Sequence, residues 1–501
     1  MKLFSQKKYV LMALLSVLII SVSAVAQTDQ GRLTGTVKDA SGAVIPGARI
    51  TVRNEKTGLE RAVDANAQGY FVITNLSPAP YSVSCKSEGL GPTELSNVDL
   101  KVGQERVLDV VLHPAAMNTE ITVAAEASVV DTSSARIGVN VGEHEVSSVP
   151  LNGRQLSQLY LMTPGAVTAG SGTYDNIRFS GRSNEENIIR FDGIEGTSII
   201  DASPGNLNGE ISSTFRLQTS LENVQEFRVE SNNYPAEYGT GSGGQISVVT
   251  KSGSNGLHGG VFEYWRNDAI DARNFFDRTS SLLPNGKSPL RMNQFGASVG
   301  GPIQKDKTFF FMSYEGLRQR VGVPFLEQVP SVAARTRAVA SIRPLLAVYP
   351  IGTAPTPNPD WEIATLNGKQ TVSENTGGIR LDYRLNDKYT LYGRYFRDQG
   401  EAFLPAGVTG NGFQSSAVPQ NAVLNLQQVL TPTVIHETKF GFNAAKTRTN
   451  GFVPDFPGVD IHAAAINLAG GTAIPGIGGQ GTSAGVALAT EIGRASCRER
   501  V

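Results

Sequence analysis

Cysteine, net charge and long apolar runs are all scarce in this sequence. Its 501 residues include two cysteines, Cys85 and Cys497, which are too few for a disulfide framework or a cysteine metal cluster. The 44 Lys and Arg residues nearly balance the 45 Asp and Glu residues. No nucleic-acid partner is expected, because such proteins carry a basic excess. Beyond residue 26, no segment approaches ~18 continuous apolar residues, so no transmembrane helix is predicted.

Catalytic and cofactor motifs are also missing. The five histidines are scattered, and none has a glutamate three residues later, so zinc-peptidase chemistry is not expected. A G-x-G-x-x-G string at residues 239–244 precedes a predicted strand, whereas a dinucleotide site needs it after a strand. Residues 286–288 match the last part of a phosphate-binding loop motif, but the motif is incomplete because Ser281 stands where it requires a glycine. We therefore expect no enzyme activity, no cofactor and no bound metal.

The first 26 residues have the pattern of a secretory signal peptide. Lysines precede an apolar run over residues 9–22, and a small-residue cleavage site follows it. The predicted cleavage residues are Ala24, Ala26 and Gln27. A membrane anchor is the alternative, but the apolar run is short for one. A lipoprotein is disfavoured because no cysteine follows the site.

The last eleven residues, 491–501, differ from everything before them. They read EIGRASCRERV and resemble the translation of a common sequencing-library adapter. We expect this segment to be an artefact and the natural protein to continue past residue 490, so that the chain is a fragment. A genuine basic loop is the alternative.

Residues 27–114 predict a small β-sandwich. Short alternating segments are separated by turn residues, as is usual for such folds. The predicted strands cover 32–38, 48–53, 61–64, 69–74, 81–86, 98–102 and 106–112. The motifs GxVxDxxGxxxPGAxxxV at 35–52 and GYFxxxxLxPxxYxV at 69–83 resemble the carboxypeptidase regulatory-like domain, a transthyretin-like sandwich with a carbohydrate-binding-like fold. The resemblance does not imply peptidase activity.

Residues 115–130 form a predicted linker that contains an alternating, β-prone string. This string resembles the TonB box, which an inner-membrane energy-coupling protein captures by adding a strand. The alternative is an ordinary strand. The candidate residues are Thr119, Glu120, Ile121, Thr122, Val123, Ala124 and Ala125.

Residues 131–251 mix a short helical segment at 155–161 with strands at 188–191, 224–230 and 245–250. The segments 149–154, 191–193, 224–230 and 238–253 resemble the plug domain of TonB-dependent receptors. Charged residues beside glycines are candidates for contacts between plug and barrel lumen, with plain surface charges as the alternative. The candidates are Asn152, Gly153, Arg154, Arg182, Arg190, Asp192 and Gly193.

Residues 252–490 predict the first part of an outer-membrane β-barrel. Aromatic residues number 24 here against 11 in residues 27–251, and strands such as 379–385 alternate apolar and charged residues. Predicted strands cover 259–265, 291–301, 307–317, 377–385, 388–397, 421–430 and 434–446. Their connections alternate between long and short, as expected when short turns face the periplasm and long loops face outward. Seven strands cannot close a plugged barrel, which needs ~22.

The whole arrangement resembles an Oar-like TonB-dependent receptor of Gram-negative bacteria. The implied fold class is mainly β: an N-terminal transthyretin-like β-sandwich, an α+β plug domain, and then an incomplete antiparallel outer-membrane β-barrel. The resemblance implies an outer-membrane protein with a periplasmic N-terminal domain that imports an unidentified small ligand or glycan. Its partners would be a TonB-type energy-coupling protein and outer-membrane lipid. A non-transporting surface, adhesion or secretion scaffold is the alternative.

Overall fold

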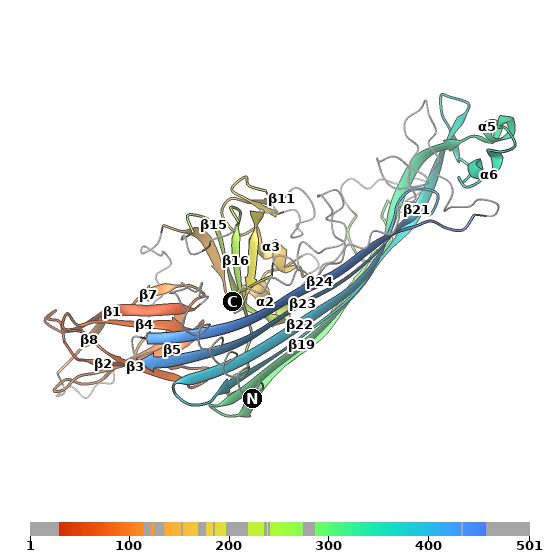
Figure 1. Ribbon diagram of the computed structural model, residues 1–501. Helices are drawn as coiled ribbons and strands as arrows, with labels where there is room; N and C mark the ends of the chain where they lie inside the picture. The colour runs from red at the N-terminus through yellow and green to blue at the C-terminus, as the bar shows by residue number, and fades with distance from the viewer. Residues whose placement is uncertain are drawn as a thin grey trace, which may run out of the picture.

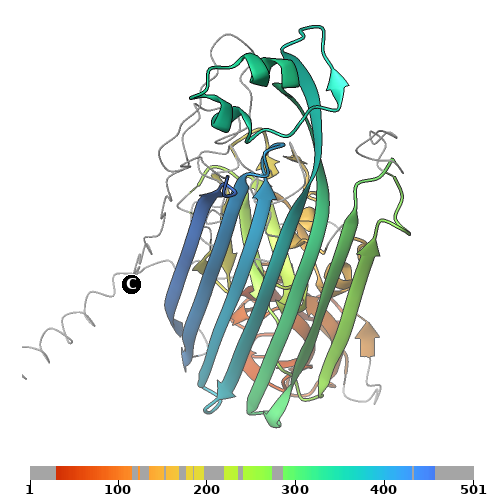
Figure 2. The same ribbon diagram turned by 90° about the vertical axis from the view of Figure 1, so that its right-hand side faces the viewer.

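The computed structural model describes three units that follow one another along the chain (Figure 1). The described residues are 30–114, 122–124, 135–151, 154–168, 177–183, 186–196, 219–234, 238, 241–273, 286–431 and 434–456. A β-sandwich lies at one end of a long curved sheet, and a middle unit of mixed α and β structure lies against the concave face of that sheet. In Figure 2 the convex face of the sheet is toward the viewer, with the other two units behind it.

Two sheets form the sandwich. Its strands are β1 (Gly31–Asp39), β2 (Arg49–Asn54), β3 (Glu60–Asp64), β4 (Tyr70–Leu76), β5 (Ala79–Lys86), β6 (Thr93–Leu100), β7 (Glu105–Val107), β8 (Val110–Leu112) and β9 (Thr122–Ala124). One sheet has the order β4-β1-β7, with β8 also on β1, and the other has the order β3-β2-β5-β6-β9. Alternate apolar side chains such as Leu33, Ile50 and Phe71 meet between the sheets and are buried. This alternation buries one face of each strand.

Two strands of the sandwich differ from the prediction. The predicted strand at 106–112 is divided at Asp109, whose exposed carboxylate accepts hydrogen bonds from the Thr36 backbone N–H and hydroxyl. Strands β7 and β8 therefore pair with different parts of β1. Strand β6 begins five residues before the predicted start at 98, and Asn97 has a positive φ of 57° within it. This irregularity interrupts the alternation that would have marked the strand's beginning.

The middle unit is built around a mixed sheet with the order β10-β15-β16-β13-β14. Its elements are β10 (Ile137–Val141), α2 (Glu143–Ser148), α3 (Leu156–Tyr160), β11 (Ala166–Thr168), β12 (Ile177–Phe179), β13 (Ile188–Phe191), β14 (Ile194–Glu195), the 3-10 turn η3 (Leu221–Asn223), β15 (Val224–Asn232) and β16 (Gln245–Thr250). Strands β13 and β16 are parallel, and the others pair antiparallel. Leu159, Tyr160 and Phe227 are buried in its core together with Phe396, which belongs to the curved sheet.

The curved sheet is antiparallel, and its strands follow chain order. They are β17 (His258–Asn267), β18 (Leu290–Gln304), β19 (Thr308–Pro330), β21 (Trp361–Arg384), β22 (Tyr389–Pro405), β23 (Gly412–Thr431) and β24 (Val434–Phe452). The short strand β20 (Ala354–Pro355) pairs with β21, and the helices α5 (Val332–Arg337) and α6 (Arg343–Leu346) lie between β19 and β20. The predicted mainly-β class, with a sandwich followed by an incomplete barrel sheet, is confirmed.

The strands of this sheet run further than predicted. The predicted loop over 318–376 is limited to residues 331–360, because β19 and β21 pair continuously from Thr308 and Tyr383 to Pro330 and Trp361. Likewise, the predicted loop over 398–420 shrinks to residues 406–411. The extra segments contain turn-prone residues such as Pro324, Asn367 and Gly368, which predict loops, although the backbone pairing of the strands continues through them.

Candidate functional site: the contact between the middle unit and the curved sheet

Asp192 is the centre of the contact between the middle unit and the curved sheet. It lies in the tight turn that joins β13 to β14, with φ of 51° at Asp192 and 81° at Gly193. Aspartate and glycine adopt this left-handed conformation more readily than other residues do. The turn therefore presents the carboxylate at the end of the middle sheet, toward the concave face of the curved sheet.

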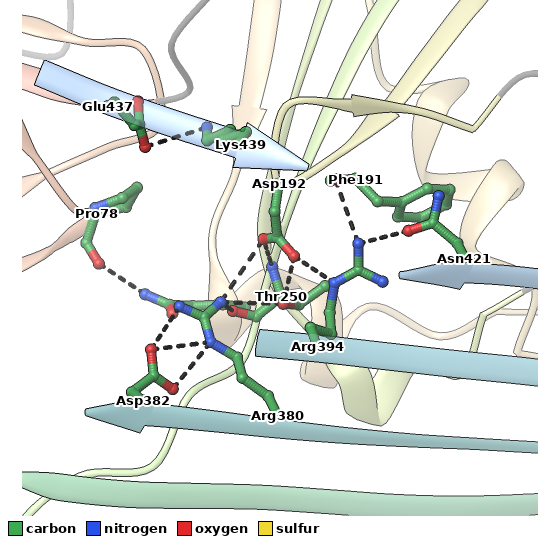
Figure 3. Close-up of polar contacts among 11 residues, drawn as sticks. Pro78, Phe191, Asp192, Thr250, Arg380, Asp382, Arg394, Asn421, Glu437 and Lys439 are labelled. Carbon is green, nitrogen blue, oxygen red and sulfur yellow. Dashed lines mark hydrogen bonds and ion pairs between the residues drawn. The ribbon is translucent and has the colours of Figure 1, made fainter. Parts of the chain in front are cut away.

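The Asp192 carboxylate is buried and fully engaged (Figure 3). Its Oδ2 is 2.6 Å from Nε of Arg394 on β22, and the exposed fraction of both side chains is 4 %. The Thr250 backbone N–H donates to Oδ1 at 2.9 Å, and the Thr250 hydroxyl donates to Oδ2 at 2.8 Å. Charge-assisted bonds of this kind are stronger than neutral ones. The carboxylate thus joins two units through a cation from one and a neutral residue from the other.

A second guanidinium balances the charge of this cluster. Nη1 of Arg380 on β21 lies 3.7 Å from Asp192 Oδ1 and donates to the Thr250 carbonyl at 3.1 Å. Arg380 also pairs with Asp382 at 2.9 Å. Two carboxylates and two guanidinium groups therefore share one buried region, so their charges offset. Burial raises the pKa of Asp192, but Arg394, Arg380 and the bonds from Thr250 outweigh it and hold the pKa below its ordinary value.

Arg154 makes a second contact with the curved sheet. Its Nη2 lies 2.8 Å from Oε1 of Glu222, and its Nη1 donates to the Tyr264 hydroxyl of β17 at 3.0 Å. The guanidinium also lies over the rings of Phe262 and Tyr264, 4.5 and 4.7 Å from their centres. Stacking on aromatic faces is a property of Arg that Lys does not share to the same degree.

Hydroxyl and amide groups extend this contact along the η3 turn. The Ser298 hydroxyl of β18 donates to Glu222 at 3.3 Å. Ser220 bonds with the buried Glu315 of β19, and Asn223 bonds with Ser313 of the same strand. The described interface is thus mainly polar, and the aromatic rings of Phe191 and Phe396 also meet across it, with ring centres 5.3 Å apart.

The other predicted plug residues either contact only the middle unit in the bonds described below or lie outside the described residues. Arg190 is buried, donates to Gln245 at 2.8 Å and lies over the Tyr238 ring. Arg182 makes long hydrogen bonds to Ser231 and Asn232 at 3.4 and 3.5 Å. Asn152 and Gly153 lie outside the described residues, as do the predicted cleavage residues Ala24, Ala26 and Gln27.

Sequence reasoning missed the partners of Asp192. The alternation over 379–385 identifies Arg380 as one of the charged residues on one face of a predicted strand, and Thr250 ends the predicted strand at 245–250. No local pattern relates residue 192 to these residues or to Arg394, about 200 positions later. Their pairing follows from where the middle unit docks.

Three described residues of the TonB-box candidate form strand β9. Thr122, Val123 and Ala124 pair in parallel with Glu94, Leu95 and Ser96 of β6, at the edge of a sandwich sheet. Thr119, Glu120, Ile121 and Ala125 lie outside the described residues. One edge of this segment is therefore already paired with the sandwich, and a capturing protein would have to use the other edge or displace β6.

The sandwich touches both other units around a small cavity. Arg61 donates to Gln427 of β23 at 2.8 Å, and Gln225 of β15 donates to the Pro78 carbonyl at 2.8 Å. The cavity between them has a volume of about 140 Å³, and Asp192 and Arg380 also line it. The buried ionic cluster therefore lies beside the point at which all three units meet.

The described ranges lack the features of a metal site, a membrane-spanning helix or a reactive thiol. No cluster of three or more His, Cys, Asp or Glu side chains there could hold a metal ion. Among the same residues, no helix has the length and apolar character needed to cross a membrane. Cys85 is a free, buried thiol, and burial raises its pKa to about 11, so it is a poor nucleophile.

Known protein families match two of the three units, the sandwich and the curved sheet. Residues 32–113 match the carboxypeptidase regulatory-like domain, and residues 249–492 match the outer membrane beta barrel domain. The chain is therefore an outer-membrane β-barrel protein with an N-terminal regulatory-like sandwich, which confirms the predicted location. Within that class it is similar to the TonB-dependent transporter Oar of Myxococcus xanthus, with 28 % identity over 311 residues. The expected resemblance is confirmed.

The match to Oar covers 59 % of this chain and 27 % of Oar, so the chain spans about a quarter of that relative. Solved structures with a similar arrangement include the siderophore receptor PirA from Acinetobacter baumannii, with 16 % identity and a TM-score of 0.37. That match covers 63 % of this chain and 44 % of PirA. The outer membrane transporter YddB from Escherichia coli has 12 % identity and a TM-score of 0.45, over 62 % of this chain and 39 % of YddB.

Proposed function

We propose that the chain is the N-terminal part of a TonB-dependent importer in which the middle unit is the plug of the barrel. The observation that carries this proposal is the buried ion pair between Asp192 and Arg394, which ties the middle unit to the inner face of the sheet at 2.6 Å. Water that enters the lumen can re-solvate such charges, so a polar contact can open and close reversibly. An apolar contact of the same area would resist this.

The arrangement of the units supports a periplasmic sandwich. It meets the curved sheet at the end that carries the short connections 305–307 and 385–388, where the Asn255 N–H donates to the Lys56 carbonyl at 3.0 Å. Short turns of outer-membrane barrels face the periplasm. The same side is where an inner-membrane coupling protein would reach the segment 119–125.

Strand addition is the mechanism that we propose for this coupling. Because β9 already pairs with β6 on one edge, the coupling protein would bind the free edge or take the place of β6. Pulling on this segment would then load the connection between the sandwich and the middle unit. Force along that connection would reach β10 first and would pass through β15 and β16 to β13 and the ionic contact around Asp192.

The ligand is an unidentified small molecule or glycan. It would enter from the opposite end of the barrel, where the connection 331–360 carries α5 and α6. Loops supported by a rigid sheet commonly determine specificity. The alternative function, a surface or secretion scaffold that does not transport, predicts that the middle unit never leaves its contact with the sheet.

Cysteine labelling in living cells separates these two functions. Thr250→Cys, in full-length protein whose natural cysteines, Cys85 among them, are replaced by serine, places a thiol inside the contact with Asp192. We expect its labelling by a maleimide to rise several-fold when the coupling protein and the proton gradient are both present. Ser41→Cys, in an exposed sandwich turn, is the control and should label equally in all conditions. Labelling of Thr250→Cys that ignores the coupling protein would instead favour the scaffold.

A further inference from the structure

The cavity at the meeting point of the three units has room for one small molecule. Its volume is about 140 Å³, and each unit supplies part of its lining. Figure 3 shows four of the lining residues: Pro78 from the sandwich, Thr250 from the middle unit, and Arg380 and Lys439 from the curved sheet. An engineered cavity of about 150 Å³ in another protein binds benzene, so the space here is large enough for a single six-membered ring.

Much of the lining is apolar or aromatic. Leu76 of β4 and Val249 of β16 contribute aliphatic side chains from two different units. Four aromatic rings also line the cavity, those of Tyr81, Phe309, Tyr383 and Tyr392. Aromatic side chains pack favourably against other rings, either stacked or edge to face. The lining therefore favours a flat aromatic ring over a hydrated ion.

Arg61 supplies a positive charge that no carboxylate balances. It is half-buried, and among the described residues it forms no ion pair, unlike the other lining cations, which are Lys56, Arg380, Arg384 and Lys439. Its guanidinium donates to the Thr74 carbonyl at 2.9 Å and to the Gln427 side chain at 2.8 Å. A guanidinium has five N–H groups, so three remain for another acceptor. Burial lowers the pKa of Arg61, and the nearby Tyr81 and Glu437 oppose this only partly, so an anion beside Arg61 would stabilise its charge.

Two amide oxygens of the lining lack hydrogen-bond donors. The buried Oδ1 atoms of Asn75 on β4 and Asn425 on β23 have no partner in the part of the chain that the structure describes. A buried acceptor without a donor costs free energy, which a donor on a ligand would recover. Asn425 lies two residues from Gln427, the partner of Arg61, so the two residues share a face of β23 about 7 Å apart. This separation is close to that of two groups at opposite ends of a benzene ring.

We propose that this cavity binds a small aromatic carboxylate that carries a hydroxyl group at the far end of its ring. The carboxylate accepts hydrogen bonds from the remaining N–H groups of Arg61, and bonds of this charged kind are strong. The ring packs among the aromatic side chains, and the hydroxyl donates to Asn425 or Asn75. The cavity lies at the sandwich end of the curved sheet, away from the connection 331–360 (Figure 1). The proposal does not rest on transport.

Such a ligand would hold the three units together. It contacts residues of all of them, so it binds the docked arrangement and not the separated units. A molecule that binds only one state of a protein stabilises that state. The ligand would therefore oppose release of the middle unit, and it would act as a regulator of the protein.

The test uses the full-length protein in a neutral detergent, with 4-hydroxybenzoate as the probe. Isothermal titration calorimetry measures its affinity, and we expect one saturable site per chain. Arg61→Met should weaken binding about tenfold or more, because the charged hydrogen bonds to the carboxylate are lost. Arg49→Met is the control: it removes the same charge from the same sandwich, its side chain is 63 % exposed and outside the lining, and it should bind like the natural protein.

Three related compounds test the chemistry of the site. 4-Methylbenzoate lacks the hydroxyl donor, 4-hydroxybenzyl alcohol lacks the charge, and acetate lacks the ring, so each should bind at least about threefold more weakly than the probe. The probe should also raise the urea midpoint of the natural protein but not that of Arg61→Met. Equal affinity of Arg61→Met for the probe would overturn the proposal, as would the lack of saturable binding or equal binding by any of the three compounds.

Leu59→Trp is a second variant that decides the question if Arg61→Met does not fold. Leu59 is half-buried, directly precedes β3 and lines the cavity, so a larger side chain there fills the space and leaves Arg61 in place. We expect this variant to lose binding of the probe. Unchanged affinity would show that the probe binds elsewhere and would overturn the proposal.

Discussion

Asp192 is a buried carboxylate whose charge is balanced by side chains of another unit. Removing one partner of a buried pair leaves the other charge in a region of low dielectric constant, and the cost is then larger than the net contribution of the pair. The polar residues around Asp192 therefore make the docked position of the middle unit specific as well as stable. A docked unit that slipped along the sheet would lose both guanidinium contacts at once.

Replacing Asp192 should weaken the docked state strongly. Asp192→Ala leaves Arg394 buried opposite no carboxylate, and we expect a loss of about 3–5 kcal/mol in the free energy of unfolding. Urea unfolding of the full-length protein in detergent measures this value. Asp387→Ala is the matched control: Asp387 pairs with Arg384 at 2.7 Å, but its side chain is 86 % exposed. The control should cost about 1 kcal/mol or less, and equal losses in the two variants would contradict our account.

Glu226 makes the association of the sandwich and the middle unit depend on pH. Burial raises its pKa to about 7, and Lys101 and the Val102 backbone oppose this only partly. The folded protein therefore holds this proton more tightly than the unfolded chain, in which the pKa is near 4.5. The stabilising contribution is fully present below about pH 4.5 and is lost as the pH rises through about 7.

Glu226→Gln should remove that dependence. We expect this variant to be more stable than the natural protein at pH 8, by roughly 3 kcal/mol at most, and equal to it near pH 4. Denaturant unfolding at a series of pH values measures the difference. Glu60→Gln, at an exposed position of β3, should follow the natural protein at every pH. A difference between Glu226→Gln and the natural protein that stayed constant with pH would show that Glu226 does not titrate in this range.

Strand β9 belongs both to the sandwich and to the proposed TonB box. Its three residues pair with β6 at the edge of a sandwich sheet. An edge strand exposes unpaired backbone groups on its outer side, which another chain can use. One short strand can therefore be held by its own domain until a partner binds it.

A proline within the segment 119–125 tests the TonB-box assignment. Ile121→Pro removes a backbone N–H from the segment and should abolish uptake in cells without changing insertion in the membrane. Uptake is followed as growth on the transported compound or as accumulation of a labelled one, and insertion is followed by outer-membrane fractionation. Ser128→Pro, in the same linker but outside the segment, is the control and should leave uptake unchanged. Normal uptake by Ile121→Pro would remove the TonB-box assignment.

For the whole molecule, the sandwich and the long connection 331–360 lie at opposite ends of the curved sheet (Figure 1). A membrane around the exposed apolar side chains of the convex face, such as Val299, Met312 and Ile379, therefore separates them. An epitope tag inserted at residues 340–341 should be bound by antibody on intact cells. A tag inserted at residues 41–42, in a sandwich turn, should be bound only after the outer membrane is permeabilised. Surface exposure of the sandwich tag would reverse the proposed orientation.

The local properties of this protein could be predicted because they depend on neighbouring residues. The period of two in strands such as 379–385 puts Ile379 and Leu381 on one face and Arg380 on the other, whatever the rest of the chain does. The order of the units and the mainly-β class follow from such patterns. The lengths of β19 and β21 could not be predicted, because their outer parts carry turn-prone residues such as Pro324 and Gly368, which only pairing with the neighbouring strand keeps extended.

Pairings between distant residues were decided by the tertiary structure alone. Asp192 meets Arg394, 202 positions later, because a β-turn in one unit docks at one register of a sheet in another. Arg291 faces Arg320 because the register of β18 and β19 aligns them. The sequence by itself determined which faces are apolar, polar or charged, since alternation is a property of each strand. The structure decided which charges share a site, because that depends on register and docking, which many distant contacts determine together.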